Sequence, residues 1–426
     1  MIPTFSINFY KMDSYYRYLN NLININKREF GRYQGLKWIS PWQAAELEAQ
    51  RNQLLMEAGN QSLFKDTKPF LNHISKGCQL CGEGQWSCLF ITGQCNANCF
   101  YCPAPQEKDE PPESQGLIFP TPEAYAEYIN YFGFKGVSFS GGEPLLVRDR
   151  VMQYLKAVRN SCNPDIYTWM YTNGLLANRE IFKSLADRGL DEVRFDIGAT
   201  GYQLKYLEQA RNVISNVTVE IPAIPEQKAL LIELLPKLVN AGVTNLNLHQ
   251  LRLTHHNAPK LIKRGYTYIP AERPIVLESE LTALEVMAYA QKNNIPIGIN
   301  YCSFHFKYRF QKAGYRKIIA KKFKNTGEKI TEKGYIRLRN GAAINYDGIT
   351  LHSMENSKLA IPSSLLELTH KKYGVQRSPA RKITIDDQHQ MLVADILNNS
   401  GSQIPKQDAL FEIWQHEYIE KGLRSY

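Results

Sequence analysis

Short apolar runs alternate with helix-like stretches between Ser87 and Cys302, and this alternation limits the fold of the 426-residue chain most strongly. Seven runs have the length and composition of buried strands: SCLFIT, GVSFS, IYTWMYT, EVRFDIG, VTVEIPA, TNLNLHQLRL and IPIGINYC. Amphipathic stretches such as TPEAYAEYINYFG and QKALLIELLPKLVNAG lie between them. Strands that alternate with helices in this way form a parallel sheet with right-handed crossovers. The sequence therefore predicts an α/β fold, a complete or partial (β/α) barrel with its active site at the carboxyl ends of the strands.

Cysteines are concentrated around the first expected strand. Six of the chain's eight cysteines lie between Cys78 and Cys102, and the last three form Cys95-x3-Cys99-x2-Cys102 directly after the run SCLFIT. Three thiolates on one loop suit a 4Fe-4S cubane and leave its fourth iron without a protein ligand. A structural zinc or iron knuckle is the alternative, because cysteines at such spacings also bind zinc. Zinc normally takes a fourth ligand close by, which favours the cluster.

A glycine-rich motif ends the second expected strand, which reads GVSFS and continues as Gly141-Gly142-Glu143-Pro144. The cysteine loop, with Tyr101 just before its last cysteine, and this GGEP motif on the following strand together resemble the two signatures of radical S-adenosylmethionine (SAM) enzymes. That resemblance implies an open (β/α)6 barrel. It also implies that the three loop cysteines hold a 4Fe-4S cluster whose bare iron binds the amino and carboxylate groups of SAM.

The resemblance implies a chemistry as well as a fold. An electron from the cluster, supplied by a donor such as flavodoxin or ferredoxin, breaks the SAM sulfonium, and the resulting 5′-deoxyadenosyl radical abstracts a hydrogen atom from the substrate. Gly141 and Gly142 would let the backbone approach the SAM methionyl group, because neither carries a Cβ. Glu143 would accept a hydrogen bond from the SAM ammonium.

Further polar residues at the strand ends are candidates for contacts with SAM. Asn173 follows the third strand, where it either contacts SAM or favours the turn before Gly174. Arg194 and Asp196 alternate with Phe195 on the fourth strand and so share a face. That face either meets the SAM carboxylate and ribose or carries an ion pair that lines the barrel.

Three histidines follow the sixth strand, namely His249, His255 and His256. Substrate would lie at this point of the barrel rim, so they are candidates for substrate contacts. Structural or solvated histidines are the alternative.

A second set of cysteines predicts a second metal site. Cys78-x2-Cys81 can hold one edge of a metal from a single turn, and Cys302 ends the last strand, where the barrel would bring it to the same rim. With Cys88 as a possible fourth ligand, this set would hold an auxiliary iron-sulfur cluster or a single iron or zinc ion. The alternatives are a buried core cysteine at Cys302 and an inward-pointing Cys88. Cys162 is expected to be an ordinary loop thiol.

Several phrases resemble one branch of the family, a group related to pyruvate formate-lyase activating enzyme. They are GCQLCGEG, CFYCPAP, LNLHQLRLTHHN and NYCSFHFKYRFQ, and the likeness spans about residues 72–350. The chain departs from the group at Cys88, where an aliphatic residue is usual. A likeness of the core does not make the chain a glycyl-radical activase.

The net charge of +10 is concentrated in one segment, Lys307 to Lys324, which has eight Lys or Arg residues and no Asp or Glu. A run of this kind is either a solvated helix face or a surface for RNA or an acidic partner. In the second case, aromatic rings within the run could stack on bases. These rings belong to Phe306, Tyr308, Phe310 and Tyr315.

Composition and segment order complete the expectations for the chain. Residues 1–75 are expected to form a helical N-terminal extension, 76–302 the barrel with the cluster loop, and 303–426 a basic α+β C-terminal extension. No run of eighteen apolar residues occurs, and the N-terminus lacks the order of a signal peptide, so we expect a cytoplasmic protein with no membrane contact.

The combined features predict a radical SAM enzyme that acts on a peptide or protein. An RNA-modifying enzyme and a glycyl-radical activase are the alternatives. An alternative of another class is a non-catalytic metal-binding protein that binds nucleic acid through the basic run.

Overall fold

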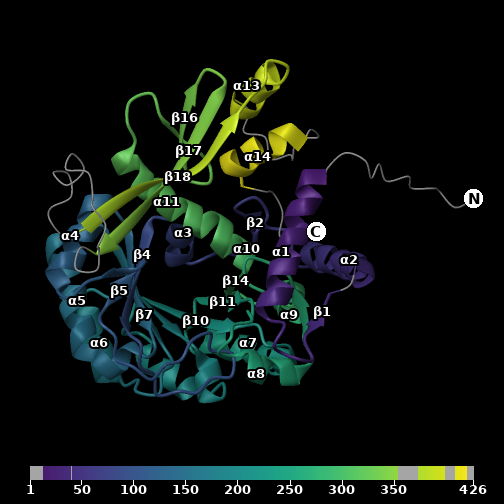
Figure 1. The fold of residues 1–426 in the computed structure, drawn as a ribbon. Coiled ribbons are helices and arrows are strands. Elements are labelled where there is room, and N and C mark those ends of the chain that lie inside the picture. Colours follow the sequence, from purple (N-terminus) through teal and green to yellow (C-terminus); the bar gives the residue numbers. More distant parts are fainter. Residues whose placement is uncertain (1–12, 40, 354–372, 399–407, 420–426) are drawn as a thin grey trace, which may run out of the picture.

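A curved, open sheet lies at the centre of the computed structural model, which describes residues 13–39, 41–353, 373–398 and 408–419 (Figure 1). Seven parallel strands follow one another across it in chain order: β4 (Trp86–Thr92), β7 (Gly136–Gly141), β8 (Tyr167–Thr172), β9 (Glu192–Phe195), β10 (Asn216–Pro222), β11 (Asn245–His249) and β14 (Gly298–Cys302). Each strand coincides with one of the seven expected runs. The predicted partial barrel is therefore confirmed.

Short antiparallel strands flank the parallel ones. β5 (Glu113–Ser114) pairs with β4, and β3 (Lys68–Leu71) pairs with β14. In the described part of the chain these two sides do not pair with each other, so the barrel stays open. β3 belongs to the segment expected to be an N-terminal extension, and the boundaries at residues 75 and 302 stay predictions.

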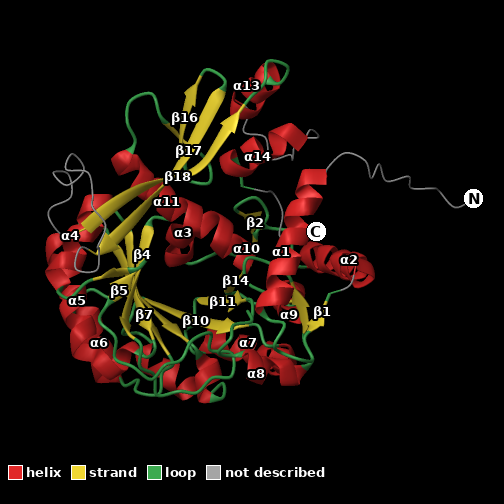
Figure 2. Cartoon of the chain, viewed as in Figure 1, coloured by secondary structure: helices red, strands yellow, loops and turns green. Residues whose placement is uncertain are grey.

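Helices cover the outer face of the sheet. Figure 2 shows α4 (Pro122–Phe132), α5 (Arg148–Ser161), α6 (Arg179–Asp187) and α7 (Lys228–Asn240) outside the strands. α4 begins where the Thr121 side chain accepts a hydrogen bond from the Ala124 N–H, and it ends at Gly133 with φ of 70°. Between β9 and β10 two 3-10 helices, Ile197–Thr200 and Leu204–Ala210, take the place of an α-helix.

Alternation along the strands decides which side chains face the helices. In β4, Leu89 and Ile91 are fully buried, whereas Trp86 and Phe90 line a cavity inside the sheet. Burying each such aliphatic side chain stabilises the fold by about 1.5 to 3 kcal/mol. The apolar residues thus bind the helices to the sheet and leave its inner face for other groups.

Two helical segments join the sheet from the N-terminal side. α2 (Pro41–Glu57) packs against α9 (Leu277–Lys292). α3 (Lys76–Gly82) contacts β4, β7 and β8, and its first turn is capped by the Ser75 hydroxyl, which accepts from the Cys78 N–H at 3.2 Å. The cap places the Cys78-x2-Cys81 pair inside the curve of the sheet.

The C-terminal part has the predicted α+β composition. After β14 come α10 (Phe304–Phe306), a π-helix over Lys307–Gln311 and α11 (Lys312–Phe323). A four-stranded antiparallel sheet follows, and then two helices: β15 (Lys329–Ile330), β16 (Ile336–Asn340), β17 (Ala343–Ser353), β18 (Tyr373–Thr384), α13 (Gln390–Asn398) and α14 (Asp408–Glu417). α14 contacts α1 (Asp13–Glu29), so the two ends of the described chain meet (Figure 1).

Among the described residues, we find no helix with the length and apolarity that a bilayer span requires.

Candidate active site

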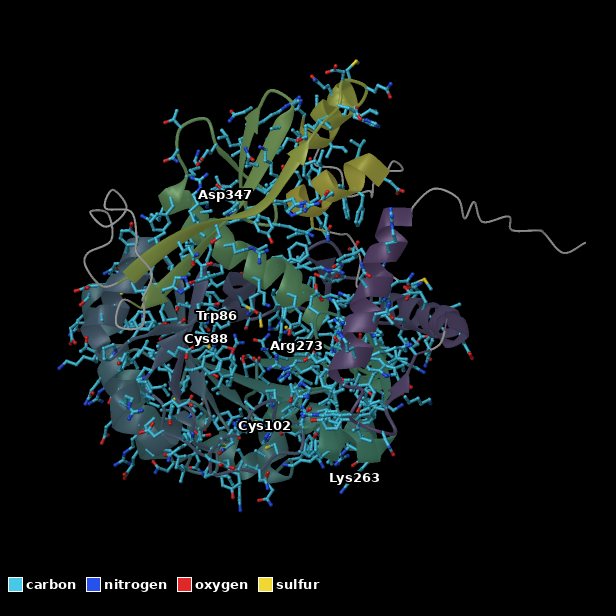
Figure 3. All side chains as sticks on the ribbon, viewed as in Figure 1. Trp86, Cys88, Cys102, Lys263, Arg273 and Asp347 are labelled. Atoms are coloured by element: carbon cyan, nitrogen blue, oxygen red, sulfur yellow. The ribbon has the colours of Figure 1, made fainter. Side chains whose placement is uncertain are left out.

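A cavity of about 510 Å³ lies inside the curve of the sheet, and both predicted groups of cysteines border it. One group comes from the loop after β4 and the other from α3 and the end of β14: Cys95, Cys99 and Cys102, and Cys78, Cys81 and Cys302. Trp86, Phe90 and Tyr171 give the cavity an aromatic wall. Figure 3 labels Trp86 on β4 and Cys102 in the loop that follows.

The loop of Cys95 to Cys102 is held by the segment after β11. The Asn257 side-chain amide is fully buried and donates to the Tyr101 carbonyl at 3.2 Å, and the Thr254 hydroxyl donates to the Pro103 carbonyl at 2.9 Å. These bonds tie the two sides of the sheet together across the cavity. Both residues lie in the phrase LNLHQLRLTHHN, but the sequence does not show that they contact the cysteine loop about 150 residues away.

The three loop thiols suit a cluster better than a single ion. Among the described residues, no three His, Cys, Asp or Glu side chains meet as the ligands of one ion do. In a cubane the three sulfurs bind different irons and so lie farther apart than the ligands of one ion. Burial, together with the charges of Asp196 and the other two thiols, raises the pKa of Cys99 to about 11. A metal that binds there must therefore displace a proton.

The GGEP motif is joined to the start of the cluster loop. The Gly142 N–H donates to the Thr92 carbonyl at 2.9 Å, and the Glu143 N–H donates to the Gln94 carbonyl at 2.7 Å. A Cβ added to Gly142 would lie 1.9 Å from the Gln94 oxygen, and one added to Gly141, where φ is 126°, would lie 2.1 Å from the Thr92 oxygen. Both glycines are therefore required by the approach of the two backbones. Both also line the cavity.

The Glu143 side chain is fully buried and joins β7 to β8. Its carboxylate accepts from the Leu145 N–H at 2.9 Å, the Thr172 hydroxyl at 2.8 Å and the Asn173 N–H at 2.6 Å. The Asn173 side chain in turn donates to Cys95 Sγ at 3.5 Å. Glu143 thus holds the residue that contacts a loop cysteine, and its expected bond to the SAM ammonium stays a prediction.

Tyr101 and Asp196 form a pair on the cavity wall. The Tyr101 hydroxyl lies 2.9 and 3.0 Å from the two Asp196 carboxylate oxygens, and the Gly198 N–H donates to one of them at 3.1 Å. Burial raises the pKa of Asp196 to about 6. The pair connects the cluster loop to the end of β9.

Arg194 lies on the same face as Asp196 but pairs with buried carboxylates. Its guanidinium donates to Glu192 at 2.9 Å and to Glu220 at 2.8 Å, and it lies 3.8 Å from Cys78 Sγ. Burial alone would raise the pKa of Glu220, but the Arg194 charge and other contacts lower it to about 2. Arg194 thus has its ion pairs with Glu192 and Glu220, whereas Asp196, the other residue for which an ion pair was expected, is hydrogen bonded to Tyr101. Contacts of both residues with SAM stay predictions.

The thiols of the second group, Cys78, Cys81 and Cys302, all border the same cavity. Cys81 lies within electrostatic reach of Cys78 and Cys302, and burial together with the Cys302 charge raises the pKa of the Cys81 thiol. Cys88 has other partners, since its thiol is hydrogen bonded to Ser138 and Ser140. Figure 3 labels it beside Trp86 on β4.

The three histidines at the end of β11 and after it lie in different surroundings. His249 lines the cavity, where burial and the Lys307 charge lower its pKa to about 3 and keep the imidazole neutral. His255 is exposed, stacks on Phe30 with ring centroids 4.7 Å apart, and lies 3.5 Å from a Glu29 carboxylate oxygen. His256 is also exposed, and the lining of the cavity in this segment ends at Arg252, so only His249 of the three histidines lines the cavity.

In the basic run, aromatic rings pack against other parts of the chain, and only four of the eight cations are exposed. Phe306 is fully buried, the Phe310 ring packs on Phe64 at 5.7 Å, and Tyr315 stacks on Phe134 at 6.3 Å. Phe310 and Tyr315 are partly buried by these contacts, and Tyr308 is partly buried beside Phe304 at 5.8 Å. Phe306 is therefore excluded from stacking on bases, and base stacking by the other three rings stays a prediction. The exposed cations of the run are Lys312, Lys321, Lys322 and Lys324.

Several residues that line the cavity were not among the predicted site residues, and they include Lys68, Glu220, Asn300 and Gln311. Glu220 could have been found, because it alternates with Val219 and Ile221 in an otherwise apolar strand. Lys68 gives no such signal, since it lies in a short strand outside the regular alternation.

Comparison with known proteins identifies the family. The model of the radical SAM superfamily matches residues 89–212, a segment that contains the cluster loop and the GGEP motif. A protein of Methanocaldococcus jannaschii that bears the name of a glycyl-radical enzyme activating enzyme is 31% identical over 276 residues, which cover 62% of this chain and 72% of that protein. The chain belongs to the radical SAM superfamily. This radical SAM protein is therefore an enzyme that uses a 4Fe-4S cluster and SAM, and the non-catalytic alternative is excluded.

Other relatives match the radical SAM protein over shorter stretches. The GTP 3′,8-cyclase of Desulforamulus reducens is 27% identical over 167 residues, 38% of this chain and 48% of the cyclase. This chain thus spans about half the length of the cyclase. Among solved structures, that of SuiB from Streptococcus suis has a TM-score of 0.37 and 11% identity, and the match covers 69% of this chain and 63% of SuiB.

Proposed function

We propose that Cys95, Cys99 and Cys102 hold the 4Fe-4S cluster of this radical SAM enzyme and that SAM binds in the cavity against Gly141 and Gly142. The observation that carries the proposal is the direct attachment of the cysteine loop to the GGEP motif, through the two backbone hydrogen bonds of 2.9 and 2.7 Å. The thiols and both glycines border the same cavity. No other described loop combines three cysteines with such a motif.

The residues around the loop have distinct roles in this arrangement. Once bound, the cluster and SAM supply the 5′-deoxyadenosyl radical that abstracts hydrogen from the substrate. Asn173 donates toward the Cys95 sulfur, and Glu143 fixes the backbone of Asn173. Tyr101 orients the Asp196 carboxylate, whose remaining lone pairs can accept from the ribose hydroxyls of SAM.

The proposed substrate is a protein or peptide, and a reduced electron-transfer protein supplies the electron. The Methanocaldococcus relative supports this, because an enzyme that activates a glycyl-radical enzyme acts on a protein, and the match covers 72% of that relative. An activase is the narrower form of the same proposal.

RNA is the weaker candidate. A surface that binds single-stranded RNA combines phosphate contacts with accessible stacking rings. Phe310 and Tyr315 of the basic run are packed against Phe64 and Phe134. The ring of Tyr308 is covered by the Lys312 ammonium, 4.1 Å from the ring centroid, so few rings of the run are open for stacking on bases.

The substrate class can be tested without knowing the substrate. Reconstituted enzyme, SAM and a chemical reductant are mixed with an extract of the source cells, and 5′-deoxyadenosine is measured against enzyme alone. The extract is treated beforehand with an immobilised protease or with RNase. We expect extract to stimulate 5′-deoxyadenosine formation, and we expect the protease to abolish that stimulation.

The control is the variant in which Cys95, Cys99 and Cys102 are all alanine, which should give no product with any extract. Stimulation that survives the protease but is lost after RNase treatment would overturn the protein substrate in favour of RNA.

A further inference from the structure

The second group of thiols, Cys78, Cys81 and Cys302, also lines the cavity. Cys78 and Cys81 come from α3, and Cys302 comes from the end of β14, the last strand of the parallel sheet. Segments more than two hundred residues apart are therefore brought to one place by the fold. None of these three thiols forms a disulfide.

A buried lysine accompanies these thiols. Lys68 is 1% exposed and lies within electrostatic reach of all three. β3 pairs with β14 through Asn300 and Phe70, and continuing this antiparallel register by two residues puts Lys68 opposite Cys302. The Lys68 ammonium lies 4.5 Å from the centroid of the Phe306 ring.

An ammonium in such a place needs negative charge nearby, because burying an unpaired charge is very costly. The negative groups that act on Lys68 are the three thiols, in their ionised form, and Glu220. Glu220 already pairs with Arg194 at 2.8 Å. A buried cation beside the three cysteines would be balanced by thiolates that ligate a metal.

Side-chain N–H groups surround the sulfurs as well. Gln311 Nε2 donates to Cys81 Sγ at 3.0 Å, and Asn300 Nδ2 lies 3.8 Å from Cys78 Sγ, as does a guanidinium nitrogen of Arg194. Donors of this kind orient metal-bound thiolates and set the reduction potential of iron-sulfur clusters. A buried cysteine that only fills space would not need them.

We propose that Cys78, Cys81 and Cys302 hold a second iron-sulfur cluster, of the 4Fe-4S type, with the iron that lacks a cysteine ligand facing the cavity. A structural zinc site has four protein ligands, whereas this group supplies three cysteines. Cys88 is not included, since its thiol is engaged by Ser138 and Ser140. The cavity then lies between two clusters, and substrate binds between them.

Metal analysis tests this proposal without an activity assay. Iron and sulfide are measured per chain after anaerobic reconstitution of the parent and of two triple alanine variants, one for each group of cysteines. We expect about eight irons in the parent and about four in each triple variant, since each 4Fe-4S cluster carries four. Cys88→Ala and Cys162→Ala are matched controls and should keep the parent content.

The outcomes separate this inference from the proposed function. If the variant lacking Cys95, Cys99 and Cys102 retains no iron, or if the variant lacking Cys78, Cys81 and Cys302 keeps the parent content, the second cluster does not exist. In the latter case SAM cleavage would remain, and the proposed function would stand alone.

A charge variant gives an independent readout in case the cysteine variants fold poorly. Lys68→Met keeps the length and apolar stem of the side chain but removes its charge. In the background that lacks Cys95, Cys99 and Cys102, it should lower the reduction potential of the remaining cluster, because a nearby cation favours the reduced, more negative state. Lys68→Arg should restore the potential. An unchanged potential in Lys68→Met would contradict the placement of the cluster beside Lys68.

Discussion

Gly142→Ala is expected to damage the cluster loop through a backbone clash. The added Cβ would lie 1.9 Å from the Gln94 oxygen and 2.3 Å from the Gln94 carbonyl carbon, whereas real Cβ contacts essentially never fall below 3.0 Å. The backbones of β7 and the cluster loop must therefore separate by about 1 Å, the difference between 3.0 and 1.9 Å. No flexible side chain can move aside, since the obstacle is main chain.

The separation weakens both backbone hydrogen bonds that join the motif to the loop, from Gly142 to Thr92 and from Glu143 to Gln94. Overpacking costs about 1 to 3 kcal/mol and each of the two hydrogen bonds about 0.5 to 1.5 kcal/mol, so we expect a loss of about 2 to 6 kcal/mol. Cys95 follows Gln94 directly, so iron binding at the loop should fall as well.

The assay combines anaerobic urea unfolding with iron analysis. Gly348→Ala is the matched control, because the nearest atom to its added Cβ is 3.9 Å away and its φ lies outside the left-handed region. The control should change the free energy of unfolding by less than about 1 kcal/mol. If Gly142→Ala keeps the stability and iron content of the parent, the contact between the motif and the loop does not hold the loop in place.

Three further predictions concern other contacts. Glu143→Gln presents an N–H₂ group to backbone N–H donors, so urea unfolding should show a loss of about 1 to 3 kcal/mol. Burial alone would raise the pKa of Glu328, but hydrogen bonds from Arg377 hold it below the ordinary 4.5, so the pair stabilises the fold above that pH and loses its effect as the pH falls. In Arg377→Gln the free energy of unfolding should therefore fall less steeply as the pH is lowered below 4.5. An unchanged slope would show that the Glu328–Arg377 pair does not cause the loss of stability in acid. Changing Lys321 and Lys322 to Gln should leave the thermal midpoint and SAM cleavage unchanged, and a loss of SAM cleavage would contradict their placement as solvated cations.

Much of the fold could be predicted because its strands are regular. Most of the seven runs are rich in apolar residues on the face that meets the helices, as Leu89 and Ile91 show in β4, and periodicity reveals such a pattern directly. The helix at Pro122 carries its own signals at both ends, Thr121 and Gly133. The short strand β3 carries none, and its place beside β14 depends on tertiary pairing alone.

The residues of the site could be predicted only where several ligand-type residues lie close together in one sequence motif. The spacing of Cys95, Cys99 and Cys102 restricts the metal chemistry by itself, and the GGEP motif adds an independent signature. The supports at Thr254 and Asn257 come from a loop about 150 residues away, and no local pattern identifies a residue whose role is to hold another segment. The basic run was misleading for a related reason, because Phe306 is buried and Tyr315 packs on Phe134, although both lie in or next to a stretch rich in lysine.

The most direct test of the central claim is the amount of 5′-deoxyadenosine that each reconstituted variant forms from SAM under a strong reductant. The parent and Cys162→Ala should both form it, whereas Cys95→Ala, Cys99→Ala and Cys102→Ala should each form none and lose the visible absorbance of their cluster. Product formation at the parent level by any of these three variants would show that its cysteine is not a ligand, and would contradict the account.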